Sequence, residues 1–222
     1  AAETTAMVLK ELNISASNWR KLLDIPAGDL LDLQYKLPSL APAQSDTNKK
    51  RGLMEPGPGG FAPVVDGKAL PTHPFAPAAP EISKNKPLIV GWNEDEYTFF
   101  GMMSQDKSIF SLTFDTLPAA MEPQFGEDTR QIIDTYRKTR ASANATDIFM
   151  AAQSINMMGL GSIDIAEKKT RQGGAPVYLY NFGYKSEVQV PGTDYPLGTP
   201  HAMDISFKFN NEVPEKDGSA GH

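Results

Sequence analysis

Two short apolar runs, more than eighty residues apart, constrain the fold of this chain most strongly. One run occupies residues 86–92, and the other, residues 177–182, is rich in β-branched and aromatic side chains. Short apolar runs of this kind are typical of buried parallel strands, which need a helical crossover between them. Helical periodicity indeed fills the interval, at about 94–105, 127–140, 147–158 and 162–172. We therefore predict an α/β fold, although two or three strands are too few for a self-sufficient doubly wound sheet.

The rest of the chain adds helices, connections and one further candidate strand. Residues 3–37 have the leucine spacing of short amphipathic helices, with Pro26 suited to the start of the third. A Pro/Gly-rich connection follows at 38–60, and residues 61–67 (Phe-Ala-Pro-Val-Val-Asp-Gly) predict a short strand and turn. The last expected element spans 205–209. A polar segment at 212–222 completes the chain, and we expect it to be mobile.

Composition excludes several classes of function. The 222 residues carry a net charge of −6, which argues against nucleic acid or an anionic membrane as the principal partner. No apolar stretch reaches the roughly 18 to 20 residues that span a bilayer, and no signal-peptide pattern is found within the chain. The absence of cysteine excludes disulfides, a thiolate nucleophile and a cysteine-based zinc site, but leaves the compartment undetermined. Nothing calls for a metal, nucleotide or flavin, so we expect no cofactor.

An acidic cluster and a later histidine are the candidate catalytic groups. The first apolar run leads directly into Asn93-Glu94-Asp95-Glu96, and His201 follows the second run. A carboxylate at a strand end followed by a late histidine resembles the acid-then-base order of an α/β-hydrolase triad. In such a triad, imidazole takes and returns the serine proton, and the carboxylate fixes its tautomer.

Each candidate also has a structural interpretation. Asn93-x-x-Glu96 resembles a capping box, in which Asn93 caps a helix and Glu96 reaches back to its backbone N–H. Periodicity alone favours this capping role for Glu96 over catalysis. A lone loop histidine such as His201 is more often a satisfied hydrogen-bonding residue than a base. His73 and His222 are interpreted as incidental.

Four segments together resemble type B carboxylesterases, the cholinesterase-like branch of the α/β-hydrolases. They occur in the order and approximate spacing of that family, in its C-terminal part, and the resemblance covers most of residues 1–211. The four segments are 61–67, 87–96, 175–180 and 200–209.

The resemblance implies a role for each matched residue. It places the triad acid at Glu96, with Asp95 as its neighbour, and the base at His201. Asp204 stands where relatives usually carry Glu, and we interpret it as a supporting polar residue. Tyr97 departs from the family, since many relatives have Gly after the Asp-Glu pair.

The nucleophile of such a triad is absent from these residues. No Gly-x-Ser-x-Gly occurs in the chain, and the nearest imitation, residues 159–163, is expected to be a helix end and the cap of the next helix. We therefore expect residues 1–211 to be the C-terminal part of one α/β-hydrolase domain, incomplete as a domain and truncated at both ends: a few strands of a mostly parallel sheet, flanked by many helices.

Three functional hypotheses follow from the resemblance. In the first, the parent protein hydrolyses a small-molecule carboxylic ester through a Ser-His-Glu triad, and a missing N-terminal portion carries the serine. In the second, the parent is a non-catalytic adhesion or binding module of the same fold. In the third, this chain is a separately encoded half that assembles with a serine-bearing partner chain.

Overall fold

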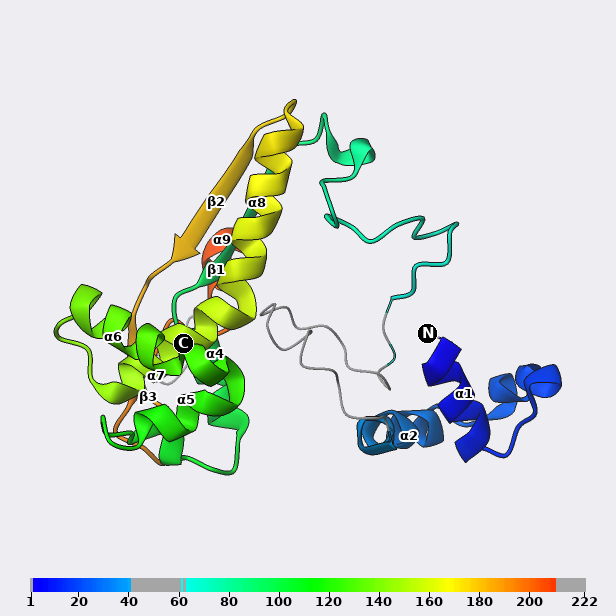
Figure 1. The fold of residues 1–222 in the computed structure, drawn as a ribbon, viewed down its shortest axis with the longest axis horizontal. Helices are drawn as coiled ribbons and strands as arrows, with labels where there is room; N and C mark the ends of the chain where they lie inside the picture. The colour runs from blue at the N-terminus through cyan, green and yellow to red at the C-terminus, as the bar shows by residue number, and fades with distance from the viewer. Residues whose placement is uncertain (1, 41–60, 62, 211–222) are drawn as a thin grey trace. The chain divides into compact units, whose positions relative to one another are not determined.

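The computed structural model describes residues 2–40, 61 and 63–210, and its contacts divide the chain into two compact units, residues 1–76 and 77–222 (Figure 1). The expectation that residues 1–211 form one domain stays a prediction.

The first unit is helical, as its leucine spacing predicted. It contains α1 (Ala2–Glu11), the 3₁₀ helix η1 (Ala16–Asp24) and α2 (Ala27–Leu40). The carbonyl of Pro26 accepts the N–H groups of Asp29 and Leu30, so Pro26 stands at the start of α2 as expected. Buried Val8, Leu33 and Leu37 form its small core. Most of the predicted connection at 38–60 lies outside the described residues.

The prediction of a strand at residues 61–67 is wrong for the residues that the structure describes there. None of them is in a strand, and the side chains of Phe61, Val64 and Val65 are exposed. A strand requires a hydrogen-bonded neighbour, and no described segment pairs with this one. The turn at its end does form, because the Asp66 carboxylate accepts the N–H groups of Lys68 and Leu70.

The second unit is organised around a parallel strand pair. β1 (Leu88–Asn93) lies beside β2 (Val177–Phe182), in a register that pairs Leu88 with Val177 and Asn93 with Phe182. Both predicted strands are confirmed, the second at its predicted bounds. Helix α8 (Leu160–Gln172) lies along the pair and contacts both strands (Figure 1).

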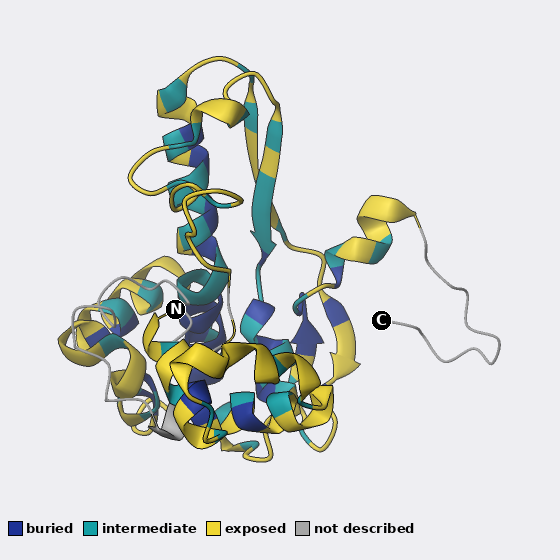
Figure 2. Ribbon diagram, turned by 90° about the vertical axis from the view of Figure 1, so that its right-hand side faces the viewer, coloured by how far each residue is buried: buried dark blue, intermediate teal, exposed yellow. Residues whose placement is uncertain are grey.

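The crossover between the strands is helical, and its buried side chains form one core together with Val190 and Leu197, which follow β2 in the sequence (Figure 2). Three of its helices correspond to predicted segments, whereas α5, which contains Pro123, was not predicted. Its elements are α4 (Glu96–Met103), η3 (Ser108–Phe110), α5 (Leu117–Phe125), η4 (Gly126–Asp128), α6 (Thr129–Thr139), α7 (Ala145–Ser154) and the π-helical turn η5 (Ile155–Gly159), which runs directly into α8.

The remaining described elements lie before and after the crossover. The 3₁₀ turn η2 (Glu81–Ser83) precedes β1, and a second, antiparallel pair follows β2, formed by β3 (Ser186–Gln189) and β4 (Pro196–Gly198). The element expected at 205–209 is a helix, α9 (Asp204–Phe209). The predicted mobile segment at 212–222 lies outside the described residues. None of the helices in the described part of the chain is long and apolar enough to cross a membrane.

A close contact between Gly91 and Tyr180 joins the two parallel strands. A Cβ atom at Gly91 would lie 2.2 Å from the Tyr180 carbonyl oxygen and 2.5 Å from its ring. Only glycine leaves room for this approach. The Tyr180 hydroxyl then reaches the carboxylate of Asp204, at the start of α9, at 3.1 Å.

The Gly91→Ala substitution is expected to lower the free energy of unfolding by about 3 kcal/mol, because the new methyl group meets backbone as well as ring atoms. The matched control is Gly161→Ala in α8, where an added Cβ would meet nothing within 4 Å. That substitution is expected to stabilise the chain by about 0.5 to 1 kcal/mol, since alanine favours helix. Urea denaturation measures both, and equal effects of the same sign would contradict this account.

Candidate active site

The parallel pairing of β1 and β2 brings both candidate catalytic segments to one edge of the strand pair. The carboxyl ends of parallel strands lie at the same edge, which is where ligands bind in open α/β sheets. β1 leads directly into α4, whose first residue is Glu96. β2 leads through β3 and β4 to His201, which lies in a turn just before α9.

Glu96 and His201 contact each other directly, although 105 residues separate them in the sequence. His201 Nδ1 lies 2.7 Å from Glu96 Oε2. The Glu96 side chain is 7% exposed and that of His201 is 39% exposed. The carboxylate is therefore buried behind an imidazole that remains accessible.

The other carboxylate oxygen of Glu96 performs half of the predicted capping role. Glu96 Oε1 accepts the backbone N–H of Asn93 at 2.8 Å. The Asn93 side chain does not cap the helix, because its Oδ1 is buried and accepts no hydrogen bond from the described residues. Its amide group donates to the Pro200 carbonyl at 2.7 Å and to Asp204 Oδ1 at 3.3 Å. The two interpretations of Glu96 are thus compatible: one oxygen holds the turn before α4, and the other faces His201.

Aromatic side chains from α4 pack beside the histidine. The ring centroids of Phe99 and Phe100 lie 5.9 Å and 5.2 Å from that of His201, with the rings tilted. The turn after the histidine contains Ala202 in the left-handed region, at φ 68°. This conformation is unfavourable for a residue with a Cβ and marks a locally constrained backbone.

Asp204 is the centre of a polar network that ties α9 to the strand pair. Its carboxylate accepts hydrogen bonds from Asn93, Tyr180 and Lys208. Burial acts to raise the pKa of Asp204, but the hydrogen bonds from Lys208, Asn93 and Tyr180 and the charge of Lys208 outweigh it and hold that pKa below the ordinary value of 3.8. Asn93 connects the Asp204 carboxylate to Glu96, because it hydrogen-bonds to both.

The neighbouring carboxylates of the acidic cluster have ion-pair partners of their own. The carboxylates of Glu94 and Asp95 pair with Lys185 at 3.1 Å and 2.5 Å. His222 lies outside the described residues, and His73 belongs to the first unit. Tyr180 and the Asn93 side chain were not singled out as site residues. The available signal for Tyr180 was Gly91, because a glycine inside a predicted strand often marks the close approach of another segment.

The Gly159–Ile163 segment is not a nucleophile turn. The expected break between two helices is absent, because η5 and α8 form one continuous helical run here. Ser162 is 8% exposed, and its hydroxyl donates to the carbonyl of Gly91 at 3.1 Å. Gly159 packs against the Trp92 ring, where a Cβ would lie 3.2 Å from a ring atom.

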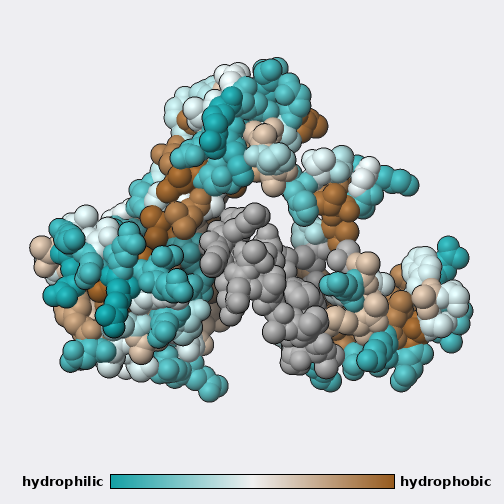
Figure 3. Space-filling view, in the orientation of Figure 1, coloured by the Kyte–Doolittle hydropathy of each residue, from teal (hydrophilic) through white to brown (hydrophobic). Residues whose placement is uncertain are grey.

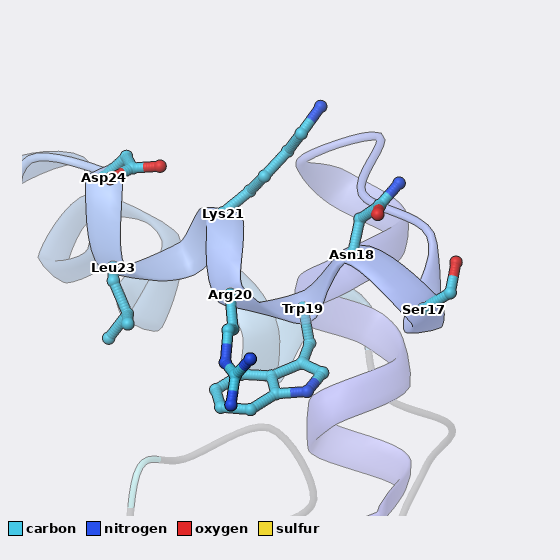
Figure 4. A pocket seen from close by; sticks show the side chains of 7 residues that line it. All are labelled: Ser17, Asn18, Trp19, Arg20, Lys21, Leu23 and Asp24. Atoms are coloured by element: carbon cyan, nitrogen blue, oxygen red, sulfur yellow. The ribbon is translucent and has the colours of Figure 1, made fainter.

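Two further kinds of site are relevant to the described residues besides the Glu96–His201 pair, a metal cluster and a surface hollow. Within the described ranges, no group of three or more His, Cys, Asp or Glu side chains is placed to hold a metal ion. An open hollow along η1 is lined by residues 17–21, 23 and 24 (Figure 4). There the Arg20 guanidinium lies 5.3 Å from the Trp19 ring centroid. This hollow contains no histidine, so it has no counterpart of the Glu96–His201 contact.

Known structures assign the fold. The chain superimposes over 99% of its length on 40% of the carboxylesterase Est55 of Geobacillus stearothermophilus, with a TM-score of 0.61 and 25% identity. With its parallel strands, crossover helices and acid–histidine edge, the chain is part of an α/β-hydrolase fold, as predicted.

Sequence comparison then assigns the family. The profile of the carboxylesterase family matches residues 42–220, and the chain belongs to this family. It is 25% identical over 166 residues to a phenmedipham hydrolase of Pseudarthrobacter oxydans, covering 68% of this chain and 28% of that protein. It is 30% identical over 134 residues to a liver carboxylesterase of Sus scrofa, covering 55% and 23% respectively. The chain thus spans less than a third of the length of these curated relatives.

The lowered pKa of Asp204 predicts a defined pH dependence of stability. A carboxyl group whose pKa is lower in the folded state stabilises the fold above its unfolded pKa, and this contribution is lost as the pH falls through the folded-state value. The difference in unfolding free energy between the native chain and Asp204→Asn should therefore be largest at neutral pH. It should shrink below about pH 4, where the unfolded carboxyl group becomes protonated.

Chemical denaturation at a series of pH values measures this difference. The control is Asp164→Asn, which removes a carboxylate that pairs with Lys168 near the surface of α8. A difference for Asp204→Asn that stays constant with pH would contradict the role given to this carboxylate.

Proposed function

We propose that the protein containing this chain hydrolyses carboxylic esters, with Glu96 as the acid and His201 as the base of a Ser-His-Glu triad. The observation that carries this proposal is the 2.7 Å contact between His201 Nδ1 and Glu96 Oε2, at the carboxyl edge of parallel strands. Membership of the carboxylesterase family supports it independently.

The geometry of the pair suits a general base. An ionised carboxylate accepts hydrogen bonds but cannot donate them. His201 Nδ1 therefore carries the proton, and the neutral ring keeps its lone pair on Nε2. Among the described residues, none hydrogen-bonds to His201 Nε2. Nε2 therefore takes the proton of a serine hydroxyl during attack on the ester and returns it to the leaving alkoxide. Glu96 stabilises the imidazolium that forms between these steps.

The nucleophile and the oxyanion donors come from residues outside this sequence, which contains no Gly-x-Ser-x-Gly. The exposure of the strand pair supports the assignment of the nucleophile to another segment. A two-stranded sheet is marginal alone, and here Ile89 and Leu179 are 71% and 46% exposed. Figure 3 shows hydrophobic surface over β2. Further strands carrying the serine would cover these side chains and complete the sheet.

In the whole protein, Glu96→Gln and His201→Ala are each expected to lower kcat for a p-nitrophenyl acyl ester by about 10³- to 10⁴-fold. Loss of the base removes proton transfer, and loss of the carboxylate removes the partner that orients it. Steady-state kinetics with thermal melting as the folding control measures the effect. Undiminished turnover in both folded variants would contradict the proposed triad.

The 222-residue chain by itself is expected to hydrolyse no p-nitrophenyl acyl ester and to take up no fluorophosphonate label. Removing a triad serine costs on the order of 10⁶-fold in kcat, and the oxyanion donors are absent as well. Mass spectrometry after incubation with the label tests this directly. Labelling at any serine of the chain would overturn the assignment of the nucleophile to another segment.

A further inference from the structure

The backbone that carries His201 is irregular and needs contacts outside its own turn to hold its shape. Left-handed residues lie on both sides of the histidine, Gly198 at φ 66° and Ala202 at φ 68°. Between them, Thr199 is fully buried, and its hydroxyl donates to the Tyr184 carbonyl at 2.5 Å. Hydrogen bonds from a residue beside a regular element help to hold a loop of this kind in one conformation.

Asp95 binds this backbone through two reciprocal hydrogen bonds. Its own N–H donates to the Thr199 carbonyl at 3.1 Å, and its carboxylate oxygen Oδ2 accepts the Thr199 N–H at 2.9 Å. The carboxylate lies so close that a Cβ at Gly198 would come within 2.4 Å of Oδ2. The polar groups of the Thr199 backbone are thus satisfied by a single residue of the acidic cluster.

This contact joins the two segments that bear the proposed acid and base. Asp95 immediately precedes Glu96, and Thr199 lies two residues before His201. The hydrogen-bonded ring therefore sets the separation between the backbones of the two groups at the point where they meet. Reaction rates are sensitive to such placement, since an error of about 1 Å costs on the order of 10²-fold.

We propose that Asp95 is a positioning residue, which holds the His201 turn against the start of α4 through Thr199 so that Nδ1 stays within hydrogen-bonding distance of Glu96. This proposal rests on the proposed ester hydrolysis. Asp95 does not touch the imidazole, and it acts on the reaction only through the turn.

The contacts of Asp95 predict which substitutions preserve this role. Oδ2 receives two donors, the Thr199 N–H and the Lys185 ammonium at 2.5 Å. Asparagine keeps an oxygen that accepts the Thr199 N–H but loses the ion pair, whereas alanine loses both. Glutamate keeps the charge but moves the acceptor by one carbon–carbon bond, about 1.5 Å.

The test is a kinetic comparison of variants in the whole protein, at a temperature well below the melting point of each. Asp95→Ala is expected to lower kcat for a p-nitrophenyl acyl ester by about 100-fold with KM nearly unchanged, because the turn shifts while the substrate pocket does not. Asp95→Asn should restore kcat to within about tenfold of the native value, since it keeps the bond to Thr199. If the alanine variant fails to fold, Asp95→Glu replaces it in the comparison, and this variant should also lower kcat.

The matched control is Glu94→Gln in the adjacent position. Glu94 makes ion pairs with Lys185 and Arg140, and this variant is expected to change kcat by no more than about twofold. Native kcat in folded Asp95→Ala and Asp95→Glu, while Glu96→Gln is impaired, would overturn the positioning role and leave the triad intact. Equal losses in Asp95→Asn and Asp95→Ala would overturn it as well. Unimpaired turnover in Glu96→Gln would instead contradict the proposed function itself.

Discussion

The parallel pairing of β1 with β2 is the constraint on which the rest of the second unit depends. Its register aligns the ends of two strands that are separated by the whole helical crossover, so the segments that follow them emerge at one edge. The pairing is close because Gly91 has no side chain and the Tyr180 ring lies against it. The same tyrosine hydrogen-bonds Asp204 and so fixes α9, the helix that follows His201. A local glycine–aromatic contact therefore contributes to the placement of the site.

Each carboxylate of the acidic cluster after β1 has a different set of partners. The Glu94 carboxylate pairs with Lys185 and Arg140, Asp95 binds the Thr199 backbone, and Glu96 contacts both Asn93 and His201. Asn93 adds a bond to the carbonyl of Pro200, next to the histidine. Asn93, Asp95 and Glu96 thus bind three consecutive residues of the other segment, which are Thr199, Pro200 and His201.

The sequence predicts the elements whose signals are local and misses those that depend on partners. The run at 177–182 has the composition of a strand and pairs with β1, whereas residues 61–67 have a similar composition but no described partner, and no strand forms in their described part. The short pair β3 and β4 has no strong local pattern and was not predicted. The two interpretations of Glu96 could not be separated by spacing, because capping uses one carboxylate oxygen and the contact with His201, 105 residues away, uses the other. The resemblance to a known family, rather than periodicity, favoured the contact.

The hydrogen bond between Glu96 and His201 is the centre of this account, and nuclear magnetic resonance of the ring protons tests it most directly. The chain contains three histidines, so labelling with ¹⁵N-histidine yields few ring signals from this part of the protein. The account predicts a downfield, slowly exchanging proton on Nδ1 of His201 that disappears in Glu96→Ala, because a charge-assisted bond to a buried carboxylate holds it there. A His201 ring protonated on Nε2 alone, or an Nδ1 proton signal unchanged in Glu96→Ala, would contradict it.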